Sequence, residues 1–292
     1  WLGLHTPLIY CLLFGALISP TDPIAVLGIL KKAGVPKKLE TKIVGESLFN
    51  DGMGVVIFLT IYGIAKTGLD NVTFQDIGIL LVREVVGGII LGLVLGFIAY
   101  RLMKSIDDYS VEVLITLAIV MGGYMLAHLI HFSGPLAVVV AGLIVGHDTV
   151  RDTSMSEITE QYIDKFWETS DALLNGILFV LIGLEILILP YNGMFIIAGV
   201  ICIPLILAIR WISLSIPISL YKEKLNFIPN TGLVMTWGGL RGGISIALAL
   251  SLLPDMNREL ILTVTYVVVV FSIVVQGLSI GKVVKRLVKL PE

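Results

Sequence analysis

The sequence is poor in charged residues. Only 14% of its 292 residues are Asp, Glu, Lys or Arg, whereas soluble domains usually carry about 25%. Apolar runs of about 20 residues take their place, and this is the length that crosses the hydrocarbon core of a bilayer. Together with a mean hydropathy of +0.98, these runs predict an all-α polytopic membrane protein.

Other absences exclude functional classes. The two cysteines, Cys11 and Cys202, lie in apolar runs, which argues against a disulfide or a cysteine metal site. A formal net charge of −2 does not indicate nucleic acid as a partner. The sequence has no nucleophile–base pair and no metal motif such as HExxH, so we expect neither an enzyme nor a cofactor.

The chain shows no low-complexity tract, separate soluble domain or cleavable signal. It begins at Trp1 and enters an apolar run almost at once. We therefore expect residues 1–292 to form a single transmembrane domain that is truncated at its N-terminus.

Hydropathy predicts about nine membrane spans. They are Leu8–Leu30, Ile43–Ala65, Ile77–Tyr100, Val111–Ile130, Pro135–Gly146, Thr169–Leu189, Phe195–Leu220, Thr231–Leu253 and Leu260–Val283. The first connection contains five lysines, Lys31, Lys32, Lys37, Lys38 and Lys42. Because cytoplasmic loops carry the excess of basic residues, this loop is predicted to be cytoplasmic, and by alternation so is the C-terminus.

Two of these spans are predicted to be interrupted. The first contains the stretch SPTDP, in which Pro20 and Pro23 remove backbone donors and clash with preceding carbonyls. The eighth contains WGGLRGG, in which four glycines around Arg241 weaken the helix. The two spans run in opposite directions, and such a pair is the sequence pointer to a transporter site built from inverted repeats.

Three charged residues fall at similar depths in three different spans. With a rise of about 1.5 Å per residue, Asp22 and Asp51 lie about 12 and 13 Å from the cytoplasmic end of their spans, and Arg241 lies about 15 Å from it. An ionised carboxylate in hydrocarbon costs several kcal/mol, so such residues usually mark a substrate or proton path.

The second span carries the stretch GESLFND. Glu46 and Asn50 are four residues apart, as are Ser47 and Asp51, and this spacing places each pair along one helical face. Carboxylate, amide and hydroxyl oxygens suit small hard cations, and carbonyls freed at a helix break add further ligands. The stretch is thus predicted to form one wall of a cation site.

Several motifs, in collinear order over essentially the whole chain, resemble the NhaP-type branch of the cation/proton antiporter-1 family. The resemblance rests on SPTDPIAVLGILKKAGVPKKLETKIVGESLFNDGMGVVIF, SGPLAVVVAGLIVGH, LNGILFVLIGLEI, WGGLRGGISIALAL and FSIVVQGLSI. It implies an NhaA-like inverted-repeat fold of thirteen helices, of which this chain would contain the last nine. It also implies two broken helices that cross, a core domain (8–65 and 195–283), a dimerisation side (about 77–190) and a homodimer.

The same resemblance implies roles for individual residues. Asp51 would carry the cation or the proton, and Ser47 and the Thr21 carbonyl would be cation ligands. Asp22 and Asn50 would order the crossing of the unwound chains. Asp22 would also contact the cation, directly or through water. Independently of the resemblance, the Asp22–Pro23 pattern is typical of an N-cap followed by the first residue of a helix, so we also expect Asp22 to cap the half-helix that begins at Pro23.

Glu46 would form an ion pair with Arg241 and so join the second and eighth spans. The sequence also permits a pair between Asp171 and Arg210. We further expect Gln276 to satisfy backbone groups of the broken eighth span. The glycine series of the third span, Gly87, Gly88, Gly92 and Gly96, is expected to permit close helix packing.

The resulting hypothesis is a secondary active transporter of the plasma membrane that exchanges Na⁺ or Li⁺ for H⁺ and serves pH and sodium homeostasis. Asn50 stands where electrogenic relatives have an aspartate, which implies electroneutral exchange of one cation for one proton. K⁺/H⁺ exchange on the same scaffold remains open, because K⁺ uses the same oxygen ligands. Three alternatives are weaker. A symporter of organic anions would need cationic or neutral donors at the breaks, and a cation channel would need an open polar path. A non-transporting scaffold would leave the buried charges without purpose.

Overall fold

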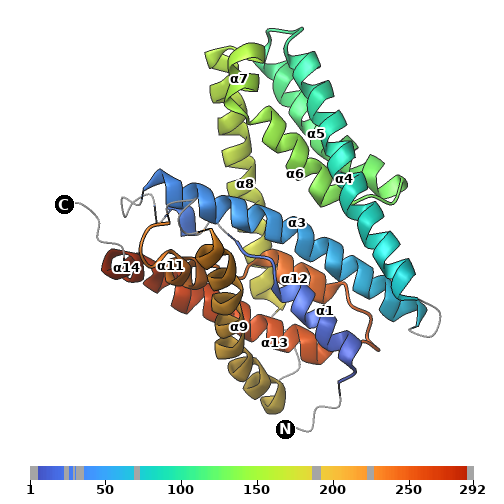
Figure 1. Ribbon diagram of the computed structural model, residues 1–292, viewed down its shortest axis with the longest axis vertical. Coiled ribbons are helices and arrows are strands. Elements are labelled where there is room, and N and C mark those ends of the chain that lie inside the picture. Colours follow the sequence, from blue (N-terminus) through green and yellow to red (C-terminus); the bar gives the residue numbers. More distant parts are fainter. Residues whose placement is uncertain are drawn as a thin grey trace. The chain divides into compact units, whose positions relative to one another are not determined.

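The computed structural model describes residues 6–22, 26–28, 30, 36–68, 73–185, 192–221 and 227–287. Within these ranges the regular elements are helices, apart from an isolated antiparallel bridge between Asp22 and Leu240 (Figure 1). The chain divides into two compact units, a first unit of residues 1–54 and 182–292 and a second unit of residues 55–181.

The second unit contains continuous helices. They are the second half of α3 (Lys37–Thr67), α4 (Phe74–Met103), α5 (Tyr109–Leu129), α6 (Gly134–Val145), α7 (Asp148–Ser154) and most of α8 (Glu157–Glu185). Side chains before the helices satisfy the first free N–H groups. Thr73 and Asp76 form a reciprocal capping box on α4, while Asp108 and Ser133 cap α5 and α6.

The glycine series of α4 packs against α6 and the turn before it, which confirms the predicted close packing. A Cβ atom added to Gly92 would lie 2.6 Å from the carbonyl oxygen of Ala137, and one on Gly88 would lie 2.9 Å from that of Ser133. A Cβ on Gly96 would overlap Ile144 in the same way. Only glycine allows the two helices to come this close.

The first unit contains the remaining helices. They are α1 (Leu8–Ile18), the first half of α3, α9 (Gly193–Leu220), α11 (Thr231–Gly238), α12 (Gly243–Leu250), α13 (Arg258–Phe271), the π-helical segment η2 (Ser272–Gln276) and α14 (Gly277–Leu287). α9 packs on α11 and α13, and α12 packs on α1 and α13. Buried aliphatic side chains from α3, α9, α11 and α14, among them Ile43, Leu214, Val234 and Val284, form a core cluster.

Both predicted breaks are present in the first unit. α1 ends at Ile18, residues 19–22 are not helical, and residues 26–28 are helical again. α11 ends at Gly238 and α12 begins at Gly243. The N–H of Asp22 donates to the carbonyl of Leu240 at 2.8 Å, so each unwound segment supplies a hydrogen-bond partner to the other.

The expected count of nine spans is met only in part. Within the described ranges, six helices are long and apolar enough to cross a membrane: α3, α4, α5, α8, α9 and the continuous run α13–η2–α14. A seventh is obtained if α6 and α7, which are bent by 63°, count as one span. The first and eighth predicted spans are divided by their breaks into helices such as α1, with 11 residues, and α11 and α12, with eight each. Each of these pieces is shorter than a bilayer crossing requires.

Candidate cation and proton site

Asp51 of α3 is bound to the unwound backbone of the first break. The N–H of Thr21 donates to Asp51 Oδ1 at 2.9 Å, and the Thr21 hydroxyl donates to the Ser47 hydroxyl at 3.0 Å. Thr21 and Ser47 are each only 2% exposed. The structure therefore brings Asp51 and Ser47 to the N–H and the hydroxyl of Thr21. The four-residue spacing of Ser47 and Asp51 directs both side chains to Thr21.

Asp22 lies where the two breaks cross. Its backbone forms the bridge to Leu240, and a Cβ atom placed on Gly242 would lie 3.0 Å from Asp22 Oδ2. Gly242 is the N-cap of α12 and provides no side-chain cap. The Asp22 carboxylate thus approaches the N-terminal end of α12, where the helix dipole favours a negative charge. The predicted cap at Pro23 lies outside the described residues.

Glu46 forms an ion pair with Arg210 of α9, which corrects the predicted pairing with Arg241. Glu46 Oε2 lies 2.9 Å from Arg210 Nη2, and the Asn50 amide donates to Glu46 Oε1. Arg210 Nε also donates to the Met235 carbonyl at 3.2 Å. Both arginines lie inside predicted spans and both side chains are long, so spacing along the chain could not distinguish them.

Arg241 binds backbone carbonyls of the first break and not a carboxylate in the described residues. Its guanidinium donates to the carbonyls of Ser19 and Pro20, the latter at 3.0 Å. These carbonyls belong to the unwound segment after α1, where no helix supplies their partners. Arg241 is 6% exposed, so a residue of the second break stabilises the backbone of the first.

Gln276 satisfies the second break, which confirms that prediction. Its amide donates to the carbonyl of Trp237 at 2.9 Å. Ser272, one turn before it in η2, accepts from the backbone N–H of Arg241 at 2.8 Å and donates to Gln276 Oε1 at 2.7 Å. Ser272 was missed from the sequence, although a serine four residues before a glutamine in an apolar span was the available signal.

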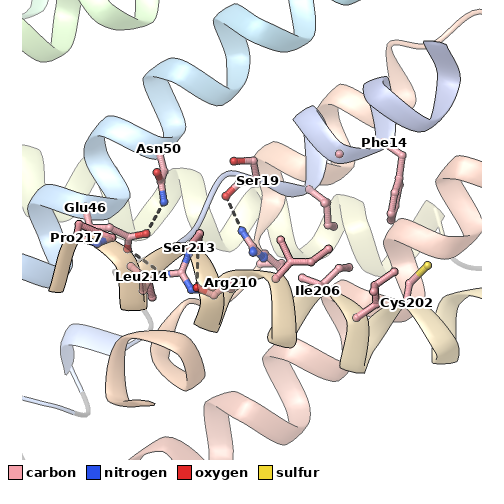
Figure 2. A pocket seen from close by; sticks show the side chains of 15 residues that line it. Phe14, Ser19, Glu46, Asn50, Cys202, Ile206, Arg210, Ser213, Leu214 and Pro217 are labelled. Atoms are coloured by element: carbon pink, nitrogen blue, oxygen red, sulfur yellow. Dashed lines mark hydrogen bonds and ion pairs between the residues drawn. The ribbon is translucent and has the colours of Figure 1, made fainter. Parts of the chain in front are cut away.

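A cavity of about 660 Å³ is lined by Glu46 and Asn50 of α3, by Arg210 of α9 and by Ser19 and Arg241 of the two breaks, together with apolar residues. Figure 2 shows Glu46 and Asn50 projecting from α3 toward Arg210 of α9 at one end, and Phe14 of α1 near Cys202 of α9 at the other. The end of the cavity at the Glu46–Arg210 ion pair is polar, whereas the end at Phe14 and Cys202 is apolar. In the lining of this cavity, Arg210 compensates the charge of Glu46, and Arg241 donates to the carbonyls of Ser19 and Pro20.

Comparisons with known proteins identify the family of the chain. Residues 1–286 match the family model described as sodium/hydrogen exchanger, transmembrane. The chain is 50% identical over 289 residues to the Na(+)/H(+) antiporter NhaP of Pseudomonas aeruginosa, covering 98% of this chain and 68% of that protein. It is 39% identical to the Na(+)/H(+) antiporter NhaH of Halobacillus aidingensis, covering 97% of this chain and 70% of that one.

Among solved structures, the sodium proton antiporter MjNhaP1 from Methanocaldococcus jannaschii matches with a TM-score of 0.73 and 22% identity. The match covers 94% of this chain and 70% of that chain, and it shows a common fold. This chain is therefore a multi-pass membrane protein of the sodium/hydrogen exchanger family, on its NhaP-type branch.

Proposed function

We propose that this protein is a secondary active transporter that exchanges Na⁺ or Li⁺ for H⁺. The observation that carries the proposal is the hydrogen bond from the unwound Thr21 N–H to the Asp51 carboxylate, beside Ser47. A carboxylate that accepts from an unwound backbone N–H can exchange this partner for a proton or a cation. Family membership and the printed activity of the NhaP and NhaH relatives support the same function.

The proposed mechanism rests on the charge of Asp51. A proton or a monovalent cation neutralises the carboxylate, and each excludes the other. Moving an uncompensated charge through the membrane interior is costly. The site therefore changes the side of the membrane that it faces only when a proton or a cation is bound. The cation would be held by Asp51, Ser47 and the Thr21 carbonyl, with Asp22 in contact or linked through water.

We further propose that exchange is electroneutral, with one cation for one proton. Asn50 donates to Glu46 and has no ionisable group, while the charges of Glu46 and Arg210 cancel. In this proposal Asp51 changes its charge during transport, while Asp22, at the N-terminal end of α12, keeps its charge.

At the level of the fold, we propose the NhaA-like inverted repeat, with the two crossed breaks related by it. The core domain, the dimerisation side, the homodimer, the cytoplasmic C-terminus and a location in the plasma membrane belong to this proposal. So does a physiological role in pH and sodium homeostasis.

The test is cation-induced proton movement in proteoliposomes that contain the full-length protein, with Na⁺, Li⁺ and K⁺ compared. Asp51→Asn is expected to reduce exchange to the background of empty liposomes, because the neutral amide cannot take up and release a proton and so cannot couple the proton to the cation. Asp171→Asn, which changes an acid bound to Asn175 in the second unit, is the matched control and should retain exchange.

Exchange that survives Asp51→Asn would overturn the assignment of Asp51 as the carrier. Faster exchange with K⁺ than with Na⁺ or Li⁺ would show that K⁺ is the substrate. Cation flux without coupled proton movement would indicate a channel. The rate should also be unchanged when the membrane potential is clamped at different values, because an unbalanced charge would couple to voltage by about 2.3 kcal/mol per 100 mV.

A further inference from the structure

Ser272 and Gln276 form a buried polar pair in the last span. Ser272 is fully buried and Gln276 is 3% exposed. Both lie in η2, a π-helical segment of five residues between α13 and α14. Short π-helical segments inside α-helices are frequent at functional sites, yet neither side chain lies among the proposed cation ligands.

The Ser272 hydroxyl begins a chain of hydrogen bonds that runs through two peptide groups. It accepts from the N–H of Arg241 at 2.8 Å. The carbonyl of Leu240, in the same peptide group as that N–H, accepts from the N–H of Asp22 at 2.8 Å. The Asp22 N–H in turn shares its peptide group with the carbonyl of Thr21.

The direction of this chain follows from peptide geometry. In a planar trans peptide the N–H and the C=O point to opposite sides. A bond to the N–H of Arg241 therefore directs the Leu240 carbonyl away from Ser272 and toward Asp22. By the same rule, the bond from the Asp22 N–H to Leu240 directs the Thr21 carbonyl away from Leu240. The series of hydrogen bonds therefore ends at the Thr21 oxygen, which is proposed as a cation ligand.

Gln276 sets the hydroxyl of Ser272 in the required orientation. Because the Ser272 proton is donated to Gln276 Oε1 at 2.7 Å, the oxygen of Ser272 presents a lone pair to Arg241. The bond from Gln276 to the Trp237 carbonyl at 2.9 Å anchors the glutamine to the end of α11. Hydrogen bonds in such a series polarise one another in a low-dielectric interior.

We propose that Ser272 is a positioning residue for the transported cation, acting through the peptide groups 240–241 and 21–22 on the Thr21 carbonyl. This inference rests on the proposed function and extends it to the last span. Loss of the Ser272 hydroxyl removes the first hydrogen bond of the series. The Thr21 carbonyl is then oriented less well for the cation. Cation affinity is expected to change more than the maximal rate.

The experiment compares Ser272→Ala with Thr265→Val in the full-length protein. Thr265 is also fully buried, but its hydroxyl donates to Ile261 of its own helix at 2.7 Å, so this variant controls for loss of a buried hydroxyl. Ser272→Ala should raise the apparent KM for Na⁺ about fivefold to tenfold, the effect of one buried hydrogen bond. Thr265→Val should leave the KM within twofold of the wild-type value.

Ser272→Thr keeps the hydroxyl and should restore the KM. Ser272→Cys, with a weak hydrogen-bonding sulfur of similar size, should resemble the alanine variant and serves if that variant does not fold. A second readout is the concentration of Na⁺ that half-maximally raises the melting temperature of the detergent-solubilised protein, which measures binding without transport.

Equal KM and equal half-maximal Na⁺ concentrations for Ser272→Ala and Thr265→Val would overturn the inference. A lowered maximal rate with unchanged KM would also overturn it, because that result assigns Ser272 to helix stability or to the moving step. If the wild-type protein exchanged no cation, the proposed function would fail, while the melting titration would still decide the role of Ser272.

Discussion

The two units satisfy their backbones in different ways. In the second unit, α4 and α5 are unbroken over 30 and 21 residues, and their internal hydrogen bonds are closed within each helix. In the first unit, two segments are unwound and depend on partners from elsewhere, such as the Asp22–Leu240 bridge and the Arg241 bonds to Ser19 and Pro20. Irregular backbone at membrane depth is stable only where protein or water supplies such partners.

The units also differ in how they hold arginine. Arg210 and Arg241 of the first unit are each 6% exposed. In the second unit, the Arg151 side chain is 23% exposed and pairs with Glu160 and Asp164, whose side chains are 39% and 55% exposed. The two buried arginines therefore lie in the unit that contains the candidate site, whereas the second unit buries an acid, Glu112. Close packing of glycines on α4 is found in the second unit, and polar partners for unwound backbone are found in the first.

The largest expected effect on stability comes from removing a buried arginine of the first unit, Arg210, and is compared with removal of Arg151 in the second unit. Arg210→Ala leaves the Glu46 carboxylate without its ionic partner and should destabilise the protein by about 3–5 kcal/mol, as for other buried pairs that lose one member. Arg151→Ala removes two ion pairs whose members are partly exposed, with Glu160 and Asp164, and should cost about 1 kcal/mol or less. Unfolding in detergent measures both, and equal losses would contradict the distinction between the units.

A smaller effect is expected from the packing of the second unit. Gly92→Ala would place a methyl group against the Ala137 carbonyl and Val140, so α4 and α6 must separate, at a cost of about 1–3 kcal/mol. Gly122→Ala in α5 has no atom within 4 Å of the added Cβ and is the matched control. The apparent KM for Na⁺ should be unchanged in both variants. A large change in KM with Gly92→Ala would show that cation binding in the first unit depends on helix packing in the second.

The smallest effect concerns the beginning of α4. The Thr73 hydroxyl accepts from the Asp76 N–H in the capping box. Thr73→Ala should lower stability by about 1 kcal/mol, whereas Thr73→Ser keeps the cap and should be nearly neutral. Thermal unfolding distinguishes the two, and equal melting temperatures would mean that the cap contributes nothing to the second unit.

Much of the candidate site could be predicted from local sequence. The breaks follow from Pro20 and from the glycines around Arg241, because these residues act on their own helix. The shared face of Ser47 and Asp51 follows from helical periodicity. The bond from Gln276 to the second break was also anticipated, since a buried amide in an apolar span requires a partner.

The partner of Glu46 could not be predicted in the same way. Arg210 and Arg241 belong to different spans, and either guanidinium has the length and charge to reach a carboxylate. The choice depends on which backbone carbonyls each arginine also meets, namely Met235 for Arg210 and Pro20 for Arg241. The division of the chain into units within α3 likewise follows from contacts between distant segments and not from any local composition.

By itself, the sequence determined that the chain is a membrane protein, where its helices break and which polar residues of the second span share a helical face, because hydropathy, proline and helical spacing act within a single segment. Only the tertiary structure decided that Arg210 pairs with Glu46, that Arg241 supports the opposite break and that Ser272 connects with Thr21 through two peptide groups. Those outcomes depend on the packing of separate helices, which places hydrogen-bonding groups within about 3 Å of one another.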